Sequence, residues 1–497
     1  MQNFNESLQA KYPHLELAIL PLSQVQMDNE SKRIDSEFAK KIHLKVKNQL
    51  LFLNSLYLKD IVVFNARYTQ PEYNQNSNLK IINSQYLRNE FIDYENAKTG
   101  YGKIVPKNAV LVNSTGIGTL GRVNINLLNL DFSIDSHINV LILNKESEIK
   151  PCYLMVFLQS KYGQFQIERY YSGSSGQIEI YPKDFNNFLI PKFPQDFQLE
   201  IEKLVKQSHE ALEDSKRLYK EAQELLYKEL ELDFKNPLEF LLKSSLQAKK
   251  ANELAIINDI SKKYPHLNIS VRPLSKSLHK SGRLDSEYYQ SKYDLMETKI
   301  KDYKGGYCKL QDIGFFTNGS FIPENLYTQH AKRAYIRIKE LSFNAPIRIQ
   351  ECIYIDDNFE ATNETMVKQN DFVIATIGNT IGKINLIPKE LNGSFISNNT
   401  SRFRLADTSI IPEFLELLLR NFVVQEQIQR EFTQTAQPKI SNTSLENILI
   451  PKIATATQEQ IALKIQKSFT LRAKSKDLLE YAKVKVEQNI QTPANQA

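Results

Sequence analysis

Short runs of alternating apolar and polar residues recur along the chain, and turn-forming residues separate them. Alternation with a period of two is typical of half-buried strands. The pattern predicts strands at 61–64, 109–112, 140–143, 372–375 and 384–387. Segments with helical spacing follow at about 151–169 and 412–432, and each predicts one helix.

A second pattern occurs near the end of each half of the chain. Apolar or small residues fall every three or four positions from Ile201 to Leu226, and again from Ile461 to Ala482. This heptad spacing predicts two helices, each about 45 Å long if some 30 residues rise about 1.5 Å each. Such helices cannot bury their seams alone in water, so we expect them to pair; the alternative is that each packs on its own domain. The seam residues that we assign to the docking of partner subunits are Ile201, Val205, Leu212, Leu218, Ile461, Ile465 and Leu478.

The two halves of the chain are copies of each other. Four of the matched pairs of blocks are 11–15 with 263–267, 33–38 with 283–288, 114–123 with 375–384, and 189–192 with 449–452. Collinear matches at nearly constant offset indicate a tandem duplication, with one folding unit per half. Residues 60–100 and 310–350 share little. A common scaffold with divergent inserts suggests one task performed on two targets; the alternative is drift in surface loops.

Two glycine-rich segments invite a nucleotide-binding interpretation. Residues 116–121 have the spacing of the dinucleotide fingerprint, but the next residues alternate like a strand, whereas the fingerprint requires a helix. Aligned without a gap, the second copy has Ile377 in place of Gly116. Residues 378–383 resemble a phosphate-binding loop, but the segment is one residue short and Ile384 replaces the required hydroxyl residue. We therefore interpret both segments as tight turns between strands.

These turns and two other segments carry our candidate DNA contacts. Arg122 and Lys383 follow the turns, where a cation beside exposed backbone N–H groups suits a phosphate; the alternative is a purely structural turn with a solvated cation. Gln177 and Gln437 lie in loops of small residues, and glutamine can pair with adenine edges; the alternative is a flexible linker. Basic residues around Tyr335 indicate either a DNA contact or an exposed strand face. The candidates are Thr115, Gly118, Thr119, Arg122, Ser174, Gln177, Lys183, Lys332, Arg333, Arg337, Thr376, Asn379, Thr380, Lys383, Gln437 and Lys439.

Composition narrows the class of protein only slightly. A net charge of +6 and a pI of about 8.8 permit a nucleic-acid partner without requiring one. Cys152, Cys308 and Cys352 form no CxxC pair, which favours free thiols in a reducing compartment over disulfides or zinc. With no signal peptide and no long apolar run, we expect a soluble, cytoplasmic protein. The histidines form no metal-ligand cluster, and Asp135 with residues 148–150 matches a nuclease metal site poorly.

Taken together, the duplicated turns, the glutamine loops leading to Leu-Ile-Pro-Lys and the heptad helices resemble the specificity subunits of type I restriction-modification systems. The resemblance covers nearly the whole chain and implies an α+β fold. Two α/β target-recognition domains would be separated by a pair of long antiparallel coiled-coil helices. The segments would be 1–195, a first recognition domain; 196–260, a central helical region; 261–454, a second recognition domain; and 455–497, a C-terminal helix.

The resemblance also implies a function. Each half would read one half of a bipartite double-stranded DNA site, while the helices would set the spacing and dock methyltransferase subunits. The chain itself would be non-catalytic and without cofactor; S-adenosylmethionine, ATP and Mg would bind partner methyltransferase and motor-nuclease subunits. The Arg-x-Asp-Ser-Glu openings also resemble those of recognition domains that serve single-chain restriction-methylation enzymes, which leaves the catalytic partner open. A coiled-coil adaptor that binds proteins is a further alternative.

Overall fold

The structure is a computed structural model that describes residues 2–15, 17, 19–23, 33–88, 90–173, 177–241, 263, 282–283, 285–328, 331–357, 359, 366–433 and 437–492. The chain forms two compact units. Unit 1 comprises Met1–Glu213 and Leu471–Ala497, and unit 2 comprises Asp214–Thr470. Each of the two long helices therefore contributes one part to unit 1 and one part to unit 2.

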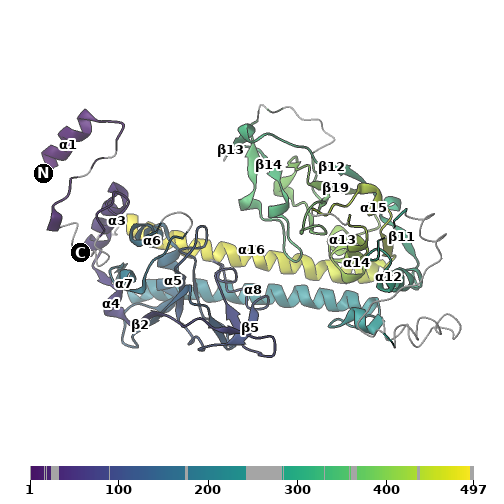
Figure 1. Cartoon of the computed structure of the whole chain (residues 1–497), viewed down its shortest axis with the longest axis horizontal. Helices are drawn as coiled ribbons and strands as arrows, with labels where there is room; N and C mark the ends of the chain where they lie inside the picture. Colours follow the sequence, from purple (N-terminus) through teal and green to yellow (C-terminus); the bar gives the residue numbers. More distant parts are fainter. Residues whose placement is uncertain are drawn as a thin grey trace. The chain divides into compact units, whose positions relative to one another are not determined.

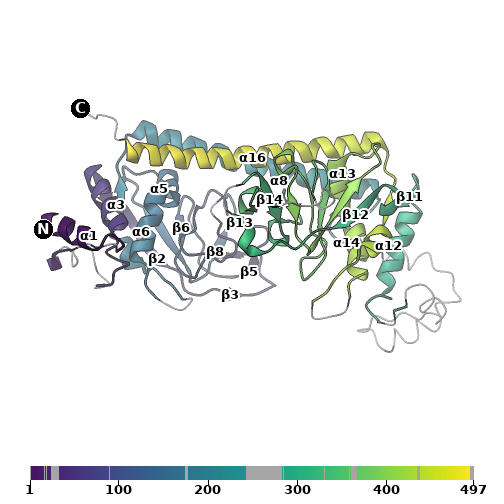
Figure 2. The same ribbon diagram turned by 90° about the horizontal axis from the view of Figure 1, so that it is seen from above.

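Among its described residues, unit 1 contains two four-stranded sheets and one two-stranded ladder. Figures 1 and 2 show the ribbon of this unit. The first sheet has the order β2–β9–β6–β7 and is antiparallel throughout. The second has the order β3–β5–β4–β8, in which β4 and β8 are parallel. The strands are β1 (Ser55–Tyr57), β2 (Val62–Arg67), β3 (Glu72–Tyr73), β4 (Lys80–Ile82), β5 (Lys98–Tyr101), β6 (Val110–Asn113), β7 (Val123–Ile125), β8 (Phe132–Ile134), β9 (Ile138–Leu143) and β10 (Leu189–Pro191), the partner of β1.

Unit 2 repeats this topology strand for strand. Its sheets have the orders β12–β19–β16–β17 and β13–β15–β14–β18, with β14 and β18 parallel, and β11 pairs with β20. The strands are β11 (Tyr307–Lys309), β12 (Gly314–Asn318), β13 (Tyr327–Thr328), β14 (Arg333–Ile336), β15 (Ile353–Ile355), β16 (Phe372–Ala375), β17 (Ile384–Leu386), β18 (Phe395–Ile396), β19 (Thr400–Leu405) and β20 (Leu449–Pro451). The divergent regions thus contain strands and buried residues and do not consist of surface loops alone.

The five predicted strands are confirmed, but the expectation that they are half-buried is wrong for the central ones. In β6, Val110 and Val112 enter one core while Leu111 enters another. In β16, Phe372 and Ile374 likewise face a different core from Val373 and Ala375. Side chains alternate across a strand, so these strands have apolar cover on both faces.

Two shorter helices stand where the sequence predicted one. Ser160 and Asn421, at equivalent positions, separate α5 from α6 and α13 from α14. Both adopt extended backbone, and their side chains accept the Gly163 and Val423 N–H groups as N-caps. The short and medium helices are α1 (Gln2–Lys11), α3 (Lys41–Phe52), α4 (Leu58–Ile61), α5 (Pro151–Gln159), α6 (Lys161–Tyr170), α7 (Pro182–Phe185), α12 (Ser291–Lys301), α13 (Pro412–Leu419), α14 (Phe422–Arg430) and α15 (Asn442–Glu446).

The two predicted long helices are α8 (Gln195–Glu229) and α16 (Thr455–Gln491). In unit 1 the buried Ser208 Oγ donates to Ser475 O at 2.5 Å, and Lys485 pairs with Glu200. In unit 2 the buried Ser468 Oγ donates to Ser215 O at 2.8 Å. Within unit 1, rising numbers on α8 meet falling numbers on α16, which confirms the antiparallel pairing there. Among the described residues, no helix is both long and apolar enough to cross a membrane.

The repeated Arg-x-Asp-Ser-Glu-aromatic openings have a structural task. Arg33 forms an ion pair with Asp35 and also donates to the carbonyl oxygen of Arg169 at 3.0 Å. The guanidinium groups of Arg33 and Arg169 both lie over the Phe38 ring, at 5.5 and 4.5 Å. In unit 2, Arg283 and Arg430 lie over Tyr288 in the same way. This motif therefore binds the segment just before α3 or α12 to the end of α6 or α14.

Candidate nucleic-acid interface

In unit 1 the glycine-rich segment is the tight turn of a hairpin between β6 and β7. Gly116, Gly118 and Gly121 have φ values of +89°, +76° and +82°, a region that favours glycine. The Thr119 hydroxyl donates to Thr115 O at 2.9 Å and closes the turn. Strand β7 follows directly where the dinucleotide fingerprint requires a helix, which confirms that this turn joins two strands.

The turn lies against the loop that carries Gln177. Gly116 N–H donates to Ile178 O at 2.9 Å, and Ile180 N–H donates to Ser114 O at 2.9 Å. Unit 2 repeats the arrangement, because Gly378 N–H donates to Pro438 O at 2.9 Å. The structure thus joins the two separately predicted segments into one surface per unit, which we call the turn–loop surface (residues 114–122 with 177–180, and 376–383 with 437–440).

These contacts correct the alignment of the two turns. Gly378, with a φ of +80°, makes the contact that Gly116 makes, so the second copy has not lost its first glycine to Ile377. The second turn is instead one residue shorter. After the turn the equivalence returns to the predicted one, since Gly121 N–H donates to Asn113 O and Gly382 N–H donates to Ala375 O. The equivalence of Arg122 and Lys383 is therefore retained.

The two cations after the turns have different surroundings. Arg122 donates to Ser84 O at 2.9 Å and to Gly118 O at 3.1 Å, so its guanidinium holds the backbone. The Lys383 ammonium, by contrast, makes no hydrogen bond or ion pair with any residue that the structure describes, although the Lys383 backbone N–H donates to Thr380 O at 3.2 Å. Burial lowers the pKa of both groups, and nearby Arg88 and Arg348, respectively, add repulsion from a like charge. Of the two, Lys383 is the better candidate for binding a phosphate.

Other candidates of unit 2 also differ in availability. Ala334, Tyr335 and Ile336 are buried, so the alternative of an exposed strand face at 332–337 is wrong. Arg333 donates to Asp357 O and Phe359 O, and Arg337 pairs with the buried Glu340. Both arginines therefore bind groups of the protein. The exposed candidates are Gly118, Gln177 and Lys183 in unit 1, and Lys332, Asn379, Gln437 and Lys439 in unit 2.

The remaining candidates are less accessible or not described. Thr115, Thr119 and Thr380 are partly buried, and Thr376 is buried at 7% exposure. Ser174 lies outside the described residues. The turn–loop surfaces also differ in charge at one equivalent position: Glu179 bridges to Thr115, whereas Lys439 bridges to Ile377. Glu179 is in turn paired with Arg67. The surface of unit 2 is therefore the more cationic.

The seam residues that we assigned to partner docking lie inside the chain's own cores. All except Leu478 are buried, and Leu478 is partly buried. A subunit that docks on α8 or α16 must therefore contact other, exposed faces of these helices.

Sequence reasoning missed a set of duplicated amides that are partly or fully buried, one pair of which supports the turn–loop surfaces. Gln164 donates to Gly121 O at 2.9 Å and Gln425 to Gly382 O at 3.0 Å. A side chain on Gly382 would meet the Gln425 amide oxygen at 2.4 Å. Two further pairs, Gln166 with Gln427 and Asn124 with Asn385, lie at equivalent places. The signal in the sequence was polar residues recurring at the same positions of apolar elements in both copies.

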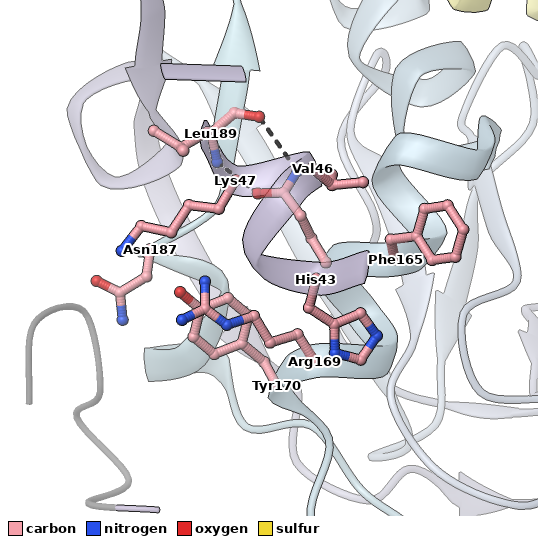
Figure 3. Close-up of a pocket in the computed structure, with 9 residues that line it drawn as sticks. His43, Val46, Lys47, Phe165, Arg169, Tyr170, Asn187 and Leu189 are labelled. Carbon is pink, nitrogen blue, oxygen red and sulfur yellow. Dashed lines mark hydrogen bonds between the residues drawn. The ribbon is translucent and has the colours of Figure 1, made fainter. Parts of the chain in front are cut away.

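A small pocket in unit 1 lies apart from the turn–loop surface, between α3 and α6 (Figure 3). Its lining includes His43, whose Nδ1 lies 3.0 Å from Glu37 O. Burial lowers the pKa of His43, which favours the neutral ring. The nearby Gln166 amide exchanges two hydrogen bonds with the Leu189 backbone, at 2.8 and 3.2 Å. The pocket thus lies where helix α6 is hydrogen-bonded to strand β10, and it is not a cleft with convergent reactive groups.

No group of three or more His, Cys, Asp or Glu side chains suited to a metal occurs among the described residues. Asp135 is buried, and burial raises its pKa, while Glu148 pairs with Lys192 at 2.6 Å. Cys152, Cys308 and Cys352 are buried and unpaired.

The model of the type I restriction modification DNA specificity domain matches residues 54–221 and 303–481, one match in each copy. No curated protein sequence matches the chain.

Three solved structures illustrate the similarity. The S subunit of a type I restriction-modification system from M. genitalium is 13% identical, with a TM-score of 0.42, over 88% of this chain and 94% of that chain. The HsdS subunit from Thermoanaerobacter tengcongensis is 13% identical, with a TM-score of 0.26, over 88% and 95%. A chain from a study of type I R-M complex assembly is 15% identical, with a TM-score of 0.28, over 88% and 96%.

The family match extends over more than half of the chain and falls on both copies of the duplication. The chain therefore belongs to the family of type I restriction modification DNA specificity domains.

Proposed function

We propose that this chain is the sequence-recognition subunit of a restriction-modification complex, in which each unit reads one half of a bipartite DNA site. The observation that carries the proposal is the repetition of one topology with different chemistry at the same place. Both units build a turn–loop surface from the same strands, yet one bears Glu179 and the other Lys439. A common frame with different surface groups suits two readers of different base sequences.

The long helices have two tasks in this proposal. As a spacer, α8 and α16 set the distance between the two half-sites. Their exposed faces dock methyltransferase subunits, because the seam residues are already buried within the chain. The exposed apolar residues Leu199 on α8 and Leu463 and Tyr481 on α16 are the first positions to examine for such contacts.

In this proposal the chain carries no catalytic centre and no cofactor of its own. Methyltransferase subunits supply S-adenosylmethionine chemistry, and motor-nuclease subunits supply ATP- and Mg-dependent steps. The complex acts on double-stranded DNA in the cytoplasm.

The experiment is methylation mapping of host DNA with and without this gene, combined with co-purification of the gene's neighbours. We expect a split motif to lose methylation on deletion, and a methyltransferase to co-purify with the chain. Unchanged methylation together with failure to capture either methyltransferase or DNA would overturn the proposal.

Binding in increasing salt separates this function from that of a protein-binding adaptor. DNA affinity should fall steeply as salt rises, because phosphate contacts release counterions. Binding to proteins alone, without DNA binding at low salt, would favour the adaptor. A single partner polypeptide with both methyltransferase and nuclease activity would instead identify a single-chain enzyme as the partner.

A further inference from the structure

The middle residue of the strand after each glycine turn is a buried asparagine. Asn124 in β7 and Asn385 in β17 occupy equivalent positions, and both are 0% exposed. Their strand neighbours on either side are apolar, for example Val123 and Ile384. An amide removed from water is unfavourable unless it forms hydrogen bonds, so its retention in both copies indicates a partner.

The partners of these amides lie in the divergent parts of the sequence. Asn124 Nδ2 donates to Arg88 O at 2.6 Å. Asn385 Nδ2 donates to Ala345 O at 2.8 Å, and its Oδ1 accepts the Ser342 N–H at 2.7 Å. The equivalent asparagine of each unit therefore binds the backbone of a segment, and the sequences of the two segments are unrelated. Backbone groups are present whatever the side chains are, so such an anchor tolerates sequence change in the segment that it holds.

A second group of the scaffold fastens each segment near the same place. Arg122 donates to Ser84 O at 2.9 Å in unit 1. In unit 2 the corresponding bond comes from Arg420, which donates to Ala345 O at 3.1 Å. The two arginines come from elements that are not equivalent, whereas the two asparagines come from the equivalent strands β7 and β17. The asparagine is thus the constant part of the anchor.

The anchored segments present exposed side chains beside the turn–loop surfaces. We call residues 83–88 and 342–348 the anchored segments. Each has a buried apolar part, with Leu87 in the first and Ile347 in the second. Each also has exposed side chains that can pair with base edges or phosphates: Gln85 and Arg88 in the first, and Asn344 and Arg348 in the second. Arg88 and Arg348 have acidic neighbours at the rather long distances of 3.7 Å (Asp93) and 3.4 Å (Glu351).

We propose that Asn124 and Asn385 are positioning residues for specificity, which hold the anchored segments beside the glycine turns so that their exposed side chains read DNA. This inference rests on the proposed function. It assigns the variable part of recognition to 83–88 and 342–348, and the constant part to one hydrogen-bonded amide per unit. Neither asparagine touches DNA itself; each acts through the segment that it holds.

The test is selection of random duplex DNA by the full chain co-purified with its methyltransferase partner, for the wild type and for Asn124→Leu. We expect Asn124→Leu to lower enrichment at the half-site read by unit 1 at least about tenfold, on the scale of one mismatched base pair, and to leave the other half-site unchanged. Asn385→Leu should have the converse effect. The matched control is Gln166→Leu, which removes a buried amide of unit 1 that holds Leu189 and should leave both half-sites readable.

Asn124→Asp is the second variant, because it keeps the size of the side chain but replaces the donor with an acceptor. It should also weaken the half-site of unit 1, and it keeps the test valid if the leucine variant does not fold. Folded variants that select both wild-type half-sites would overturn the inference, as would equal loss of both half-sites. If the wild type itself selects no site, the proposed function fails instead.

Discussion

The two units have the same strand order but differ in how their scaffolds are stabilised behind the hairpin. In unit 1, Gln159 donates to Val123 O at 2.8 Å, with Met155 one helical turn earlier. In unit 2 the equivalent Arg420 donates to Ile384 O at 2.8 Å and pairs with Glu416, where Met155 stands in unit 1. Glu416 and Arg420 are nearly fully buried. A neutral glutamine supports the hairpin in unit 1, and a buried ion pair supports it in unit 2. The topology therefore does not depend on the ion pair.

The surfaces of the two units also differ. At the tip of the first turn Ile117 is 68% exposed, whereas the shorter second turn exposes Asn379. Beside the turn, the Arg122 guanidinium holds backbone in unit 1, while the Lys383 ammonium in unit 2 is not so engaged. A duplicated scaffold can therefore keep its backbone contacts and still present an apolar tip in one copy and a polar, more cationic surface in the other.

Removal of the buried ion pair between Glu416 and Arg420 should have the greatest effect on stability. Arg420→Ala should destabilise unit 2 by about 3–5 kcal/mol, because it leaves the Glu416 carboxylate buried without its partner. Gln159→Ala in unit 1 should cost only about 1 kcal/mol, the value of one hydrogen bond. Hydrogen exchange followed by mass spectrometry, with peptides assigned to each unit, measures both.

The control is the double variant Glu416→Met with Arg420→Gln, which copies unit 1. It should recover most of the lost stability, since a well-packed apolar group can replace a buried ion pair. A double variant as unstable as Arg420→Ala would mean that unit 2 cannot be stabilised by the uncharged pair that unit 1 has at these positions.

The helix pairing should respond alike in both units. Ser208→Leu in unit 1 and Ser215→Leu in unit 2 each insert a larger side chain where two buried serines meet, and each should cost about 1–3 kcal/mol. Circular dichroism during thermal unfolding and hydrogen exchange in α8 would measure the loss. A neutral effect in only one unit would show that the seam is loosely packed there.

A smaller effect separates the two cations in DNA binding. Lys383→Ala should reduce the slope of log affinity against log salt by about 0.9, the release of one counterion, with little change in base preference. Arg122→Ala should alter base preference at the half-site of unit 1, because it frees Ser84 O in the anchored segment. Fluorescence anisotropy at several salt concentrations provides both readings, and Lys439→Ala serves as a cation control. Identical behaviour of the two variants would contradict the difference between the units.

The smallest effect is a pH dependence confined to unit 1. His43 stands where unit 2 has Tyr293, and burial lowers the pKa of His43 below its usual 6.5. Below pH 6.5 the unfolded state therefore takes up a proton before the folded state does, so stability should fall as the pH decreases from 6.5 towards the folded pKa. Hydrogen exchange at pH 7.5 and pH 5.5, after correction for intrinsic rates, should show this loss in α3 and not in α12. His43→Tyr should abolish it, and an equal loss in α12 would point to another group.

Much of the fold was predictable because it depends on periodic patterns. The alternation in 109–112 and 372–375 marked the central strands, and the heptads marked α8 and α16. The breaks at Ser160 and Asn421 were not predicted, since a cap inside an otherwise helical pattern depends on local hydrogen bonds. The two-sided burial of β6 and β16 was missed because single-sequence alternation cannot show what covers the second face.

The candidate interface was predictable only in part. The turns and the glutamine loops were found separately, but hydrogen bonds between segments some sixty residues apart join them into one surface, and no local pattern shows this. The single-residue shortening of the second turn misled the ungapped alignment at Gly378. The roles of Asn124 and Asn385 depend on partners in segments that share no sequence, so only the structure brings them together.

The most direct test of the central claim, that two similar units read two different half-sites, is DNA selection by the wild-type complex over a fully random duplex. We expect enrichment of two constant blocks of different sequence, separated by a gap of fixed length in which any base is accepted. A single continuous block, two blocks with a freely varying gap, or no enrichment at low salt would contradict it.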